Sequence, residues 1–308
     1  MAYTTINKST DHFHTKLYTA TGSAQSITGV GFQPDLVWIK DRESSGWHFW
    51  TDAVRGVTKT LFSNTNNAVS TETGGLTAFG TDGFSIGTHS NINTNGNNIV
   101  SWNWKAGTTG SGNTGGSGTY KTYSYSVNTT AGFSIVTYTG NGTGGHTIPH
   151  HLGVAPSNVI IKDYGATNSW ICKMKGYDGY LYLEKTDTGT SNSTWLPTDA
   201  NNLTLANTWG AYNTNNSTYV AYCFAEKTGY SKFGSYTGNG SSSSPSFIYT
   251  GFKPKFVIVK CTNEADAWFM HDNKRDGYND DNEYLFPNLT NVEGTNVNRL
   301  SMYYKQLI

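Results

Sequence analysis

Residues 31–41 read Gly-Phe-Gln-Pro-Asp-Leu-Val-Trp-Ile-Lys-Asp, and this stretch decides the fold. The pattern returns over residues 153–163 as Gly-Val-Ala-Pro-Ser-Asn-Val-Ile-Ile-Lys-Asp and over residues 251–260 as Gly-Phe-Lys-Pro-Lys-Phe-Val-Ile-Val-Lys. Each copy carries a glycine, a proline and a short apolar run that ends in lysine. Three copies of so long a pattern predict one supersecondary unit that is used three times.

The repeated unit has the features of a β-strand and the turn before it. Proline lacks an amide hydrogen and has a fixed φ, so it is typical of the start of a strand or of a sheet edge. The unbroken apolar run predicts a strand buried on both faces. A tryptophan follows each copy at nearly the same distance, at Trp47, Trp170 and Trp268, and we interpret all three as core residues. The chain is therefore expected to be all-β, with tandem repeats similar to β-sandwiches or jelly rolls.

The three copies define the expected domain organisation. In chain order we expect an N-terminal arm, a first repeat, a Gly/Ser-rich linker with an extra strand, a second repeat and a third repeat, over residues 1–15, 16–107, 108–130, 131–229 and 230–308. The linker is assigned because its first residues are mainly glycine, serine and threonine, a composition typical of flexible connections.

The third repeat is expected to be incomplete. The first two repeats end in a strand whose alternation places three apolar residues on one face, which are Val100, Trp102 and Trp104, or Val220, Tyr222 and Phe224. The sequence after the third copy contains no counterpart. A sandwich without this strand has an open edge and a bare apolar face. Three explanations stay open: another chain supplies the strand, the face is an assembly interface, or the sequence is cut short.

Composition argues against several classes of partner. Charged residues make up 14% of the chain and the formal net charge is zero, whereas phosphate binding requires clustered Lys and Arg. No apolar run is long enough to cross a membrane or to act as a secretory signal. The three cysteines have neither disulfide nor zinc spacing. We expect synthesis in a reducing cytoplasm, with no nucleic-acid partner, no membrane insertion and no cofactor.

The sequence offers no arrangement that is typical of an enzyme. A glycoside hydrolase requires two carboxyl groups at a fixed separation across a cleft, and the acidic residues here are few and lie mostly in predicted turns. No Gly-x-Ser-x-Gly nucleophile elbow or phosphate-binding loop occurs in a suitable setting. Glycine-rich pieces such as residues 140–145 connect strand to strand. We therefore predict a protein without catalytic residues.

One acidic loop, residues 272–283, is a candidate calcium site. The candidate ligands are Asp276, Asp280, Asp281 and Glu283. Their spacing does not match an EF-hand, and a solvated loop is the alternative. The start of the loop, Asp272 and Arg275, repeats the spacing of Asp52 and Arg55. This recurrence favours a structural Asp–Arg pair in both places.

The densest group of histidines precedes the second copy. It contains His146, His150 and His151, and metal binding is one interpretation. The favoured interpretation is a loop with surface histidines that leads into the strand.

Aromatic residues that do not recur between repeats are candidate glycan-binding residues, since core positions are expected to recur. The candidates are Trp195, Trp209, Tyr212 and the neighbouring Asn213. Exposed aromatic faces beside asparagine and glycine suit a sugar-binding site. The alternative is a loop whose aromatic rings pack over one end of a sandwich.

The order of these motifs resembles a known repeat family. The stretches TKLYTATGSAQSITGVGFQPDLVWIKDR, WNWKAG, TTAGFSIVTYTGNGT, YVAYCFAEKTGYSKFGSYTGNGS and YTGFKP are similar to repeats in virion proteins of tailed phages, common among phages of marine bacteria and cyanobacteria. The resemblance covers almost the whole chain. It implies a structural or tail-fibre-like protein and no catalytic residues. Members of that family continue through a further Gly-Phe strand and a closing aromatic strand. This sequence departs from the family pattern at that point.

The resemblance and the composition together predict a non-enzymatic virion protein, as a fibre, a spike or a decoration of the capsid or tail. Its expected partners are other virion proteins and further copies of the chain, with a trimer as the first expectation. Host-surface glycans are an additional expected target. The alternatives are a lectin-like glycan-binding module and a polysaccharide-degrading enzyme.

Overall fold

The computed structural model describes residues 4–241, 243–275, 283–295 and 300. Within these ranges the regular structure is almost entirely antiparallel β-sheet, with one 3₁₀ turn, η1 (Ser9–Asp11), and one short helix, α1 (Ser90–Asn93). The predicted all-β class is confirmed. No helix in the described ranges is both long and apolar enough to cross a bilayer.

A six-stranded sheet and a smaller sheet form a β-sandwich around the first copy of the repeated stretch. In spatial order the large sheet contains β1 (Phe13–Thr19), β9 (Asn98–Trp104), β3 (Leu36–Asp41), β4 (Phe49–Asp52), β5 (Lys59–Phe62) and β6 (Ser70–Thr71). The opposing sheet contains β2 (Gln25–Thr28), β8 (Gly83–Ile86) and β7 (Leu76–Gly80). Val37 and Ile39 of β3 share a buried cluster with Phe84 and Ile86 of β8. β3 is buried along its whole length, as its apolar run predicts.

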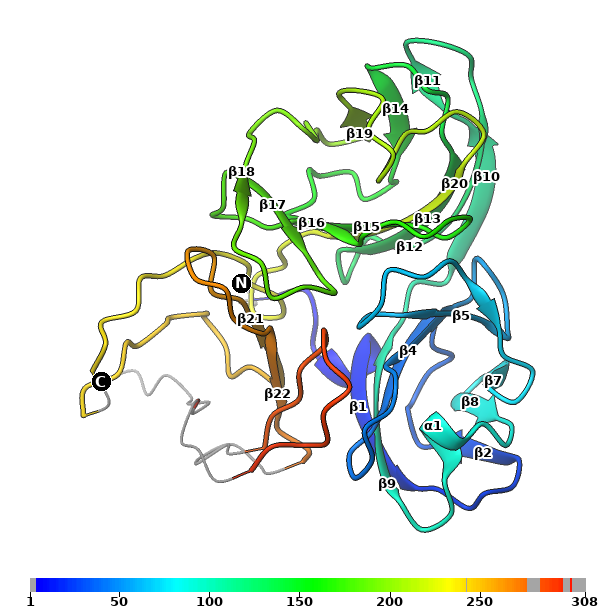
Figure 1. The fold of residues 1–308 in the computed structure, drawn as a ribbon, viewed down its shortest axis with the longest axis vertical. Helices are drawn as coiled ribbons and strands as arrows, with labels where there is room; N and C mark the ends of the chain where they lie inside the picture. Colours follow the sequence, from blue (N-terminus) through cyan, green and yellow to red (C-terminus); the bar gives the residue numbers. More distant parts are fainter. Residues whose placement is uncertain (1–3, 242, 276–282, 296–299, 301–308) are drawn as a thin grey trace.

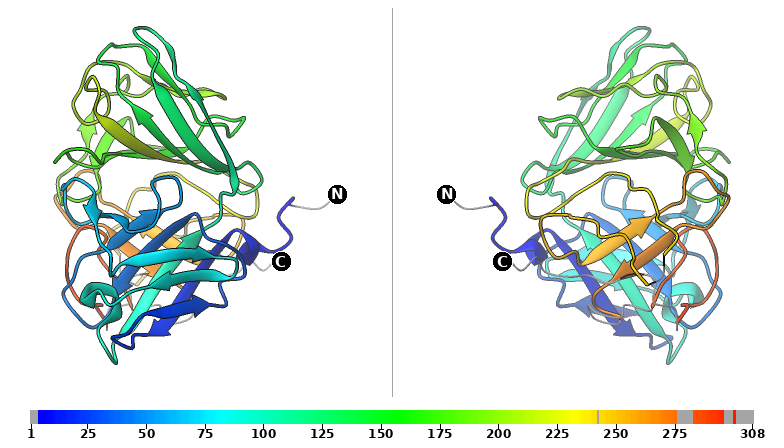
Figure 2. Two further views of the ribbon diagram at one scale, coloured as in Figure 1. Left: turned by 90° about the vertical axis from the view of Figure 1, so that its right-hand side faces the viewer. Right: turned by 90° about the vertical axis from the view of Figure 1, so that its left-hand side faces the viewer.

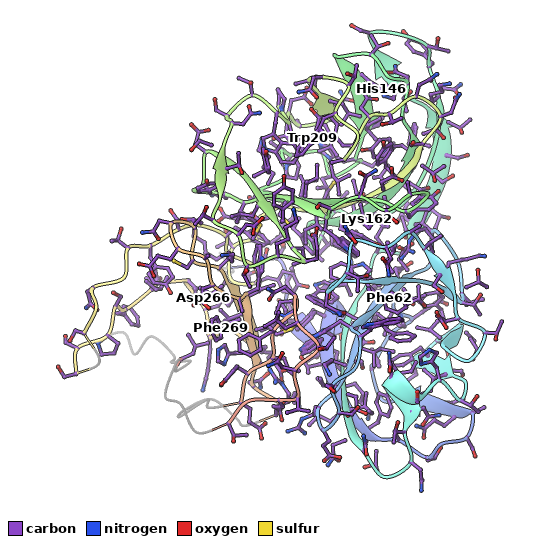
Figure 3. All side chains as sticks on the ribbon, in the orientation of Figure 1. Phe62, His146, Lys162, Trp209, Asp266 and Phe269 are labelled. Atoms are coloured by element: carbon purple, nitrogen blue, oxygen red, sulfur yellow. The ribbon has the colours of Figure 1, made fainter. Side chains whose placement is uncertain are left out.

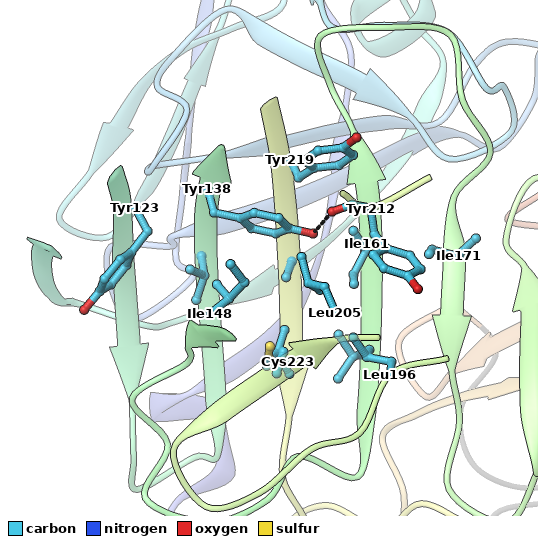
Figure 4. Close-up of a cluster of buried hydrophobic side chains, with 14 of the residues drawn as sticks. Tyr123, Tyr138, Ile148, Ile161, Ile171, Leu196, Leu205, Tyr212, Tyr219 and Cys223 are labelled. Carbon is cyan, nitrogen blue, oxygen red and sulfur yellow. Dashed lines mark hydrogen bonds between the residues drawn. The ribbon is translucent and has the colours of Figure 1, made fainter. Parts of the chain in front are cut away.

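A second sandwich surrounds the second copy. Its large sheet contains β10 (Thr108–Asn113), β12 (Thr122–Asn128), β13 (Phe133–Thr139), β20 (Thr218–Phe224), β15 (Asn158–Asp163), β16 (Ile171–Lys173), β17 (Gly179–Tyr182) and β18 (Thr190–Ser191). Its small sheet contains β11 (Gly115–Gly116), β14 (His146–Pro149) and β19 (Asn202–Leu205). Figure 4 shows the core between them, to which Ile148 of β14, Leu205 of β19 and Ile161 of β15 all contribute.

The predicted flexible linker is wrong over residues 108–116, which form strands β10 and β11. β10 pairs with β12 in a register that places Gly110 opposite Tyr125 and Gly112 opposite Tyr123. A Cβ atom at Gly110 would lie 2.6 Å from the Tyr125 hydroxyl, so these glycines leave room for the tyrosine rings across the strand pair. A glycine pattern that looks like a linker therefore belongs to a sheet whose partner strand carries the side chains. The predicted extra strand is confirmed as β12.

The first two sandwiches share their strand order and individual hydrogen bonds. The order β1-β9-β3-β4-β5-β6 recurs as β13-β20-β15-β16-β17-β18. The Tyr18 hydroxyl donates to the carbonyl of Ile92 at 2.9 Å, and the Tyr138 hydroxyl donates to the carbonyl of Tyr212 at 2.9 Å (Figure 4). Each hydrogen bond ties β1, or its counterpart β13, to the segment that precedes the central strand, β9 or β20. These contacts give Tyr212 the position that Ile92 has in the first sandwich.

The third copy forms only a two-stranded sheet within the described residues. β21 (Phe256–Val259) pairs with β22 (Phe269–Asp272), in the arrangement that β3 has with β4 and β15 has with β16. The three copies lie around a common centre, with β21 and β22 in orange beside the two larger sandwiches (Figure 1). The side views in Figure 2 place the second sandwich above the other two parts. We call these the first, second and third lobes, each named by its copy of the repeated stretch.

Candidate functional site

A cluster of buried side chains joins the three lobes at their centre. It includes Trp50, Trp102, Trp170, Tyr222 and Trp268. The ring centroid of Trp50 lies 5.3 Å from that of Trp170 and 5.0 Å from that of Tyr222. Aromatic pairs at such separations contribute about 0.5–1.5 kcal/mol each beyond the area they bury. Because its members come from all three lobes, we call this cluster the shared centre.

Two buried tryptophans each reach from one lobe into the next. Trp170 of the second lobe donates from Nε1 to the carbonyls of Phe62 at 3.1 Å and Thr65 at 3.0 Å in the first lobe. Trp268 of the third lobe donates from Nε1 to the carbonyl of Tyr182 in the second lobe at 3.0 Å. Both rings are almost fully buried, so each indole N–H needs the partner that the neighbouring lobe supplies.

His48 occupies the corresponding position in the first lobe and lies near the backbone of the third lobe. Its side chain is fully buried, and burial holds the pKa of the imidazole well below its ordinary value, although the backbone of Phe286 and Leu289 in the third lobe favours protonation. The sequence assigned Trp47 to this place, and that assignment is wrong, because the Trp47 side chain is 39% exposed. Counting from the proline of each copy, rather than matching residue types, leads to residue 48.

A buried ion pair in the first lobe binds a residue of the second lobe. Arg55 Nε lies 2.6 Å from Asp52 Oδ2, and both side chains are buried. The Tyr222 hydroxyl of the second lobe donates to the same carboxylate oxygen at 2.7 Å. The predicted Asp52–Arg55 pair is confirmed. It has an additional role as an acceptor for the neighbouring lobe.

The same arrangement joins the third lobe to the first. Arg275 Nε lies 2.6 Å from Asp272 Oδ2, again fully buried, and Trp102 Nε1 of the first lobe donates to that oxygen at 3.0 Å. The predicted Asp272–Arg275 pair is confirmed as well. Trp102 and Tyr222 occupy matching places in β9 and β20, so the central strand of each complete lobe donates to a carboxylate of another lobe.

The second lobe lacks this carboxylate. Met174 and Tyr177 stand where the other lobes have aspartate and arginine, counted from the proline of each copy. Both side chains are partly buried and pack against the shared centre, as do Phe256 and Ile258 of β21. The third side of the shared centre is therefore apolar and partly exposed.

A lysine ends each copy and ties its own loop to the strand. Lys40 Nζ donates to the carbonyls of Asp41 and Ser44, and Lys162 Nζ donates to those of Asp163 and Ala166. Both side chains are fully buried, and burial lowers the pKa of each amine to about 8. Lys260 makes the equivalent contact with the carbonyl of Cys261.

The low pKa of Lys162 predicts a pH-dependent stability. The pKa of about 8 in the folded chain rises to an ordinary value near 10.5 on unfolding, so the unfolded chain binds more protons between these pH values and stability rises with pH there. Wild type should therefore gain stability relative to Lys162→Met between pH 7.5 and 9.5, measured by urea unfolding. Lys8→Met, at an exposed lysine, is the control and should show no such change. A gap between wild type and Lys162→Met that is equal at both pH values would contradict the assignment.

Three of the four candidate glycan-binding residues are buried. Trp195 is 2% exposed and donates from Nε1 to the carbonyl of Gly179 at 2.9 Å. Tyr212 is fully buried and donates to Asn207 Oδ1 at 2.8 Å. Trp209, labelled in Figure 3, is half-buried against the rings of Tyr180, Trp195 and Tyr212. A sugar stacks on an exposed ring face, so this group serves the core at the end of the second sandwich.

Asn213 is a structural hub. It is fully buried, accepts from the amide of Asn141 at 3.1 Å and donates to the carbonyls of Thr143 and Asn207 at 2.9 and 3.0 Å. Asn93 makes the matching contacts in the first lobe, with the amide of residue 21 and the carbonyls of residues 23 and 87. Because both lobes contain these contacts, we assign Asn213 a structural role in the sandwich.

The candidate calcium ligands lie mostly outside the described residues. Asp276, Asp280 and Asp281 fall in the range 276–282, which the structure does not describe. Glu283 is described, and its carboxylate lies 2.9 Å from Arg42 Nη2 of the first lobe. Within the described ranges no group of three His, Cys, Asp or Glu side chains is placed to hold a metal ion.

The three clustered histidines have separate structural contacts. His146, labelled in Figure 3, is buried in β14 between Thr114 Oγ1 at 2.7 Å and Asn213 Oδ1 at 3.2 Å. His150 is also buried, whereas His151 is partly exposed and stacks on Tyr125 with 3.7 Å between centroids. The prediction of surface histidines is therefore wrong for His146 and His150. Strand pairing with β19 carries this segment into the core.

Two small surface hollows are present, of about 180 and 120 Å³. The first lies between β2 and β8, and the second lies between β1 and the residues that flank β21 and β22. Ligand pockets usually measure about 300–1,000 Å³, and neither hollow is lined by two acidic residues.

The fold defines an all-β protein with sandwich lobes that share one aromatic centre. Residues 8–304 match a family described as a domain of unknown function (DUF7483), and the chain belongs to this family. No curated protein and no solved structure matches the chain.

Proposed function

We propose that the chain is a non-enzymatic structural component of a tailed-phage virion, as a fibre, a spike or a decoration protein that acts in assembly. The observation that carries the proposal is the shared centre. The buried carboxylates Asp52 and Asp272 and the rings of Trp170 and Trp268 all hold one lobe to another. An enzyme would place its carboxylates in a cleft, whereas Asp52 and Asp272 accept hydrogen bonds from a neighbouring lobe. The resemblance of the repeats to virion proteins supports the particular setting.

Light scattering of the purified chain, with intact mass, tests the assembly role. A homo-oligomer is expected, with a trimer as the first expectation, because virion components act in symmetric arrays. The same sample should release no reducing ends from host polysaccharide. A monomer at all concentrations that binds a glycan or cleaves a polysaccharide would overturn the proposal and favour the lectin or the hydrolase.

A further inference from the structure

A small hollow of about 120 Å³ lies where the first and third lobes meet. Its walls come from parts of the chain that are far apart in the sequence, namely η1, the start of β1 and the residues that flank β21 and β22. Besides Phe13, the lining residues are Thr10, His14, Thr15, Lys255, Asn273 and Lys274. These six side chains are polar, and none of them is acidic. The fold therefore gathers basic and neutral polar groups that the sequence keeps more than a hundred residues apart.

Two lysines of the third lobe line this hollow. Lys255 Nζ donates to Ser9 Oγ of η1 at 3.0 Å. Burial lowers the pKa of Lys255, and the neighbouring charge of Lys274 lowers it further. The carboxylate next in sequence, that of Asp272, is already paired with Arg275. Two like charges beside one hollow repel each other, and a bound anion would relieve the repulsion.

His14 lines the hollow from the first lobe. Its Nδ1 atom lies 2.7 Å from the carbonyl oxygen of Val30. Because a carbonyl oxygen only accepts, Nδ1 carries a hydrogen, and Nε2 is the atom that gains a proton when the ring becomes charged. Burial lowers the pKa of His14, and the hydrogen bond to Val30 opposes that effect. A protonated His14 would add a second N–H donor to the hollow.

The charges around His14 are mainly positive. Three ammonium groups lie near enough to lower its pKa, those of Lys274, Lys16 and Lys255. The carboxylate of Asp82 also interacts with His14. The two oxygens of Asp82 accept hydrogen bonds from the amides of Gly29 at 2.9 Å and Gly31 at 2.7 Å. Three positive charges and one negative charge therefore surround this ring.

Thr15 provides a second, independent indication of a ligand. Its side chain lines the same hollow and is 4% exposed. Its Oγ1 atom has no hydrogen-bond partner among the described residues. A buried hydroxyl without a partner is unfavourable, and a bound ion is one of the ways in which proteins satisfy such a group. An acceptor in the hollow would give this hydroxyl a partner.

We propose that this hollow binds one tetrahedral oxoanion, a phosphate or a sulfate group, between the first and third lobes. Pockets for whole small molecules usually measure about 300–1,000 Å³, so the hollow suits a single charged group. A tetrahedral group offers acceptor oxygens in several directions, as donors on two lobes require. A free inorganic ion and an ester on a polysaccharide share this chemistry. The site is independent of the proposed assembly function.

Nuclear magnetic resonance of the histidine rings in the full chain tests the site. Sodium sulfate is titrated at constant ionic strength, and the imidazole signal of His14 is assigned by its loss in His14→Gln. We expect a saturable shift of this signal with a Kd of about 1 mM. The pKa of His14 should rise in sulfate, because a bound anion favours the protonated ring. His151, a partly exposed histidine of the second lobe, is the internal control and should not respond.

Two lysine variants separate the site from a general effect of charge. Lys274→Met should weaken sulfate binding about tenfold, because it removes one charge-assisted donor. Lys59→Met removes the same charge at an exposed position of the first lobe outside the hollow, and it should bind as wild type does. Both positions are exposed, and unfolding transitions confirm that the variants are folded. A His14 shift that does not saturate, an equal shift at His151, or equal binding by the two variants would overturn the proposal.

A second titration identifies the source of the anion. Dextran sulfate is the probe for an ester on a polysaccharide, with unsulfated dextran as its control, and inorganic phosphate is the probe for a free ion. A His14 shift at a lower concentration of ester groups than of free sulfate would support the site and assign it to a polysaccharide. A shift with inorganic phosphate but not with dextran sulfate would support the site and assign it to a free ion. An equal response to unsulfated dextran would overturn the proposal.

Discussion

Replacing Asp52 with alanine is expected to lower the free energy of unfolding by about 3–5 kcal/mol, because it leaves a buried charge without its partner. Arg55 is fully buried in this ion pair, and the Tyr222 hydroxyl depends on the same carboxylate. Urea unfolding of the purified variant measures the loss. The matched control is Asp11→Ala, which breaks an exposed pair with Lys8 at the same i, i+3 spacing and should leave the midpoint unchanged.

The chain itself provides a substitute for this network. Met174 and Tyr177 of the second lobe stand at the positions of Asp52 and Arg55. The double variant Asp52→Met with Arg55→Tyr should therefore lose less stability than Asp52→Met alone, since it removes both charges together. Adding Tyr222→Phe removes the remaining unpaired hydroxyl and should restore part of the loss. Additive losses across this series would show that the buried pair does not act as a unit.

Replacing Trp170 with alanine is expected to have an effect of similar size, about 3–5 kcal/mol, because a large and fully buried ring leaves a cavity. The ring also donates to two carbonyls of the first lobe, those of Phe62 at the end of β5 and of Thr65 in the loop that follows. The variant therefore weakens a joint between lobes as well as a core. In differential scanning calorimetry we expect wild type to unfold in a single transition and the transition of the variant to broaden or split, since the second sandwich loses its link to the first.

Two further variants serve as controls for Trp170→Ala. Trp47→Ala removes a tryptophan that is 39% exposed and outside the joint, and it should have a much smaller effect. Trp170→His copies the residue that the first lobe uses at this position, so it should retain more stability than alanine. Equal losses for Trp47→Ala and Trp170→Ala would contradict the assignment of Trp170 to a joint.

Local sequence patterns predicted the strands well, because the physical signal for a strand is local. The apolar run of the first copy became β3, and the alternation of residues 98–104 became β9. The spacing of Asp272 and Arg275 also predicted their pairing, since residues three apart in a tight turn can meet without help from the rest of the chain.

Features that depend on contacts between distant strands were not predictable in the same way. The glycines of β10 indicate a linker until Tyr123 and Tyr125 are known to lie across the pair. Trp195 and Tyr212 are loop aromatic residues that do not recur between the copies, and only the folded sandwich shows that they are buried. The shared centre itself joins residues from all three lobes, and nothing in a single stretch of sequence encodes it. Aligning the copies on their prolines would have revealed His48 and Met174.

The most direct test of the unpaired edge of β21 is amide hydrogen exchange. The exchange rates of residues 256–259 are compared with those of residues 36–41 and 158–163. All three segments are the same strand of the repeated unit, but only β21 lacks a strand on its outer edge among the described residues. We predict that β21 exchanges much faster than β3 and β15. Strong protection of β21 in the free chain, equal to that of β3, would contradict an open edge at the shared centre.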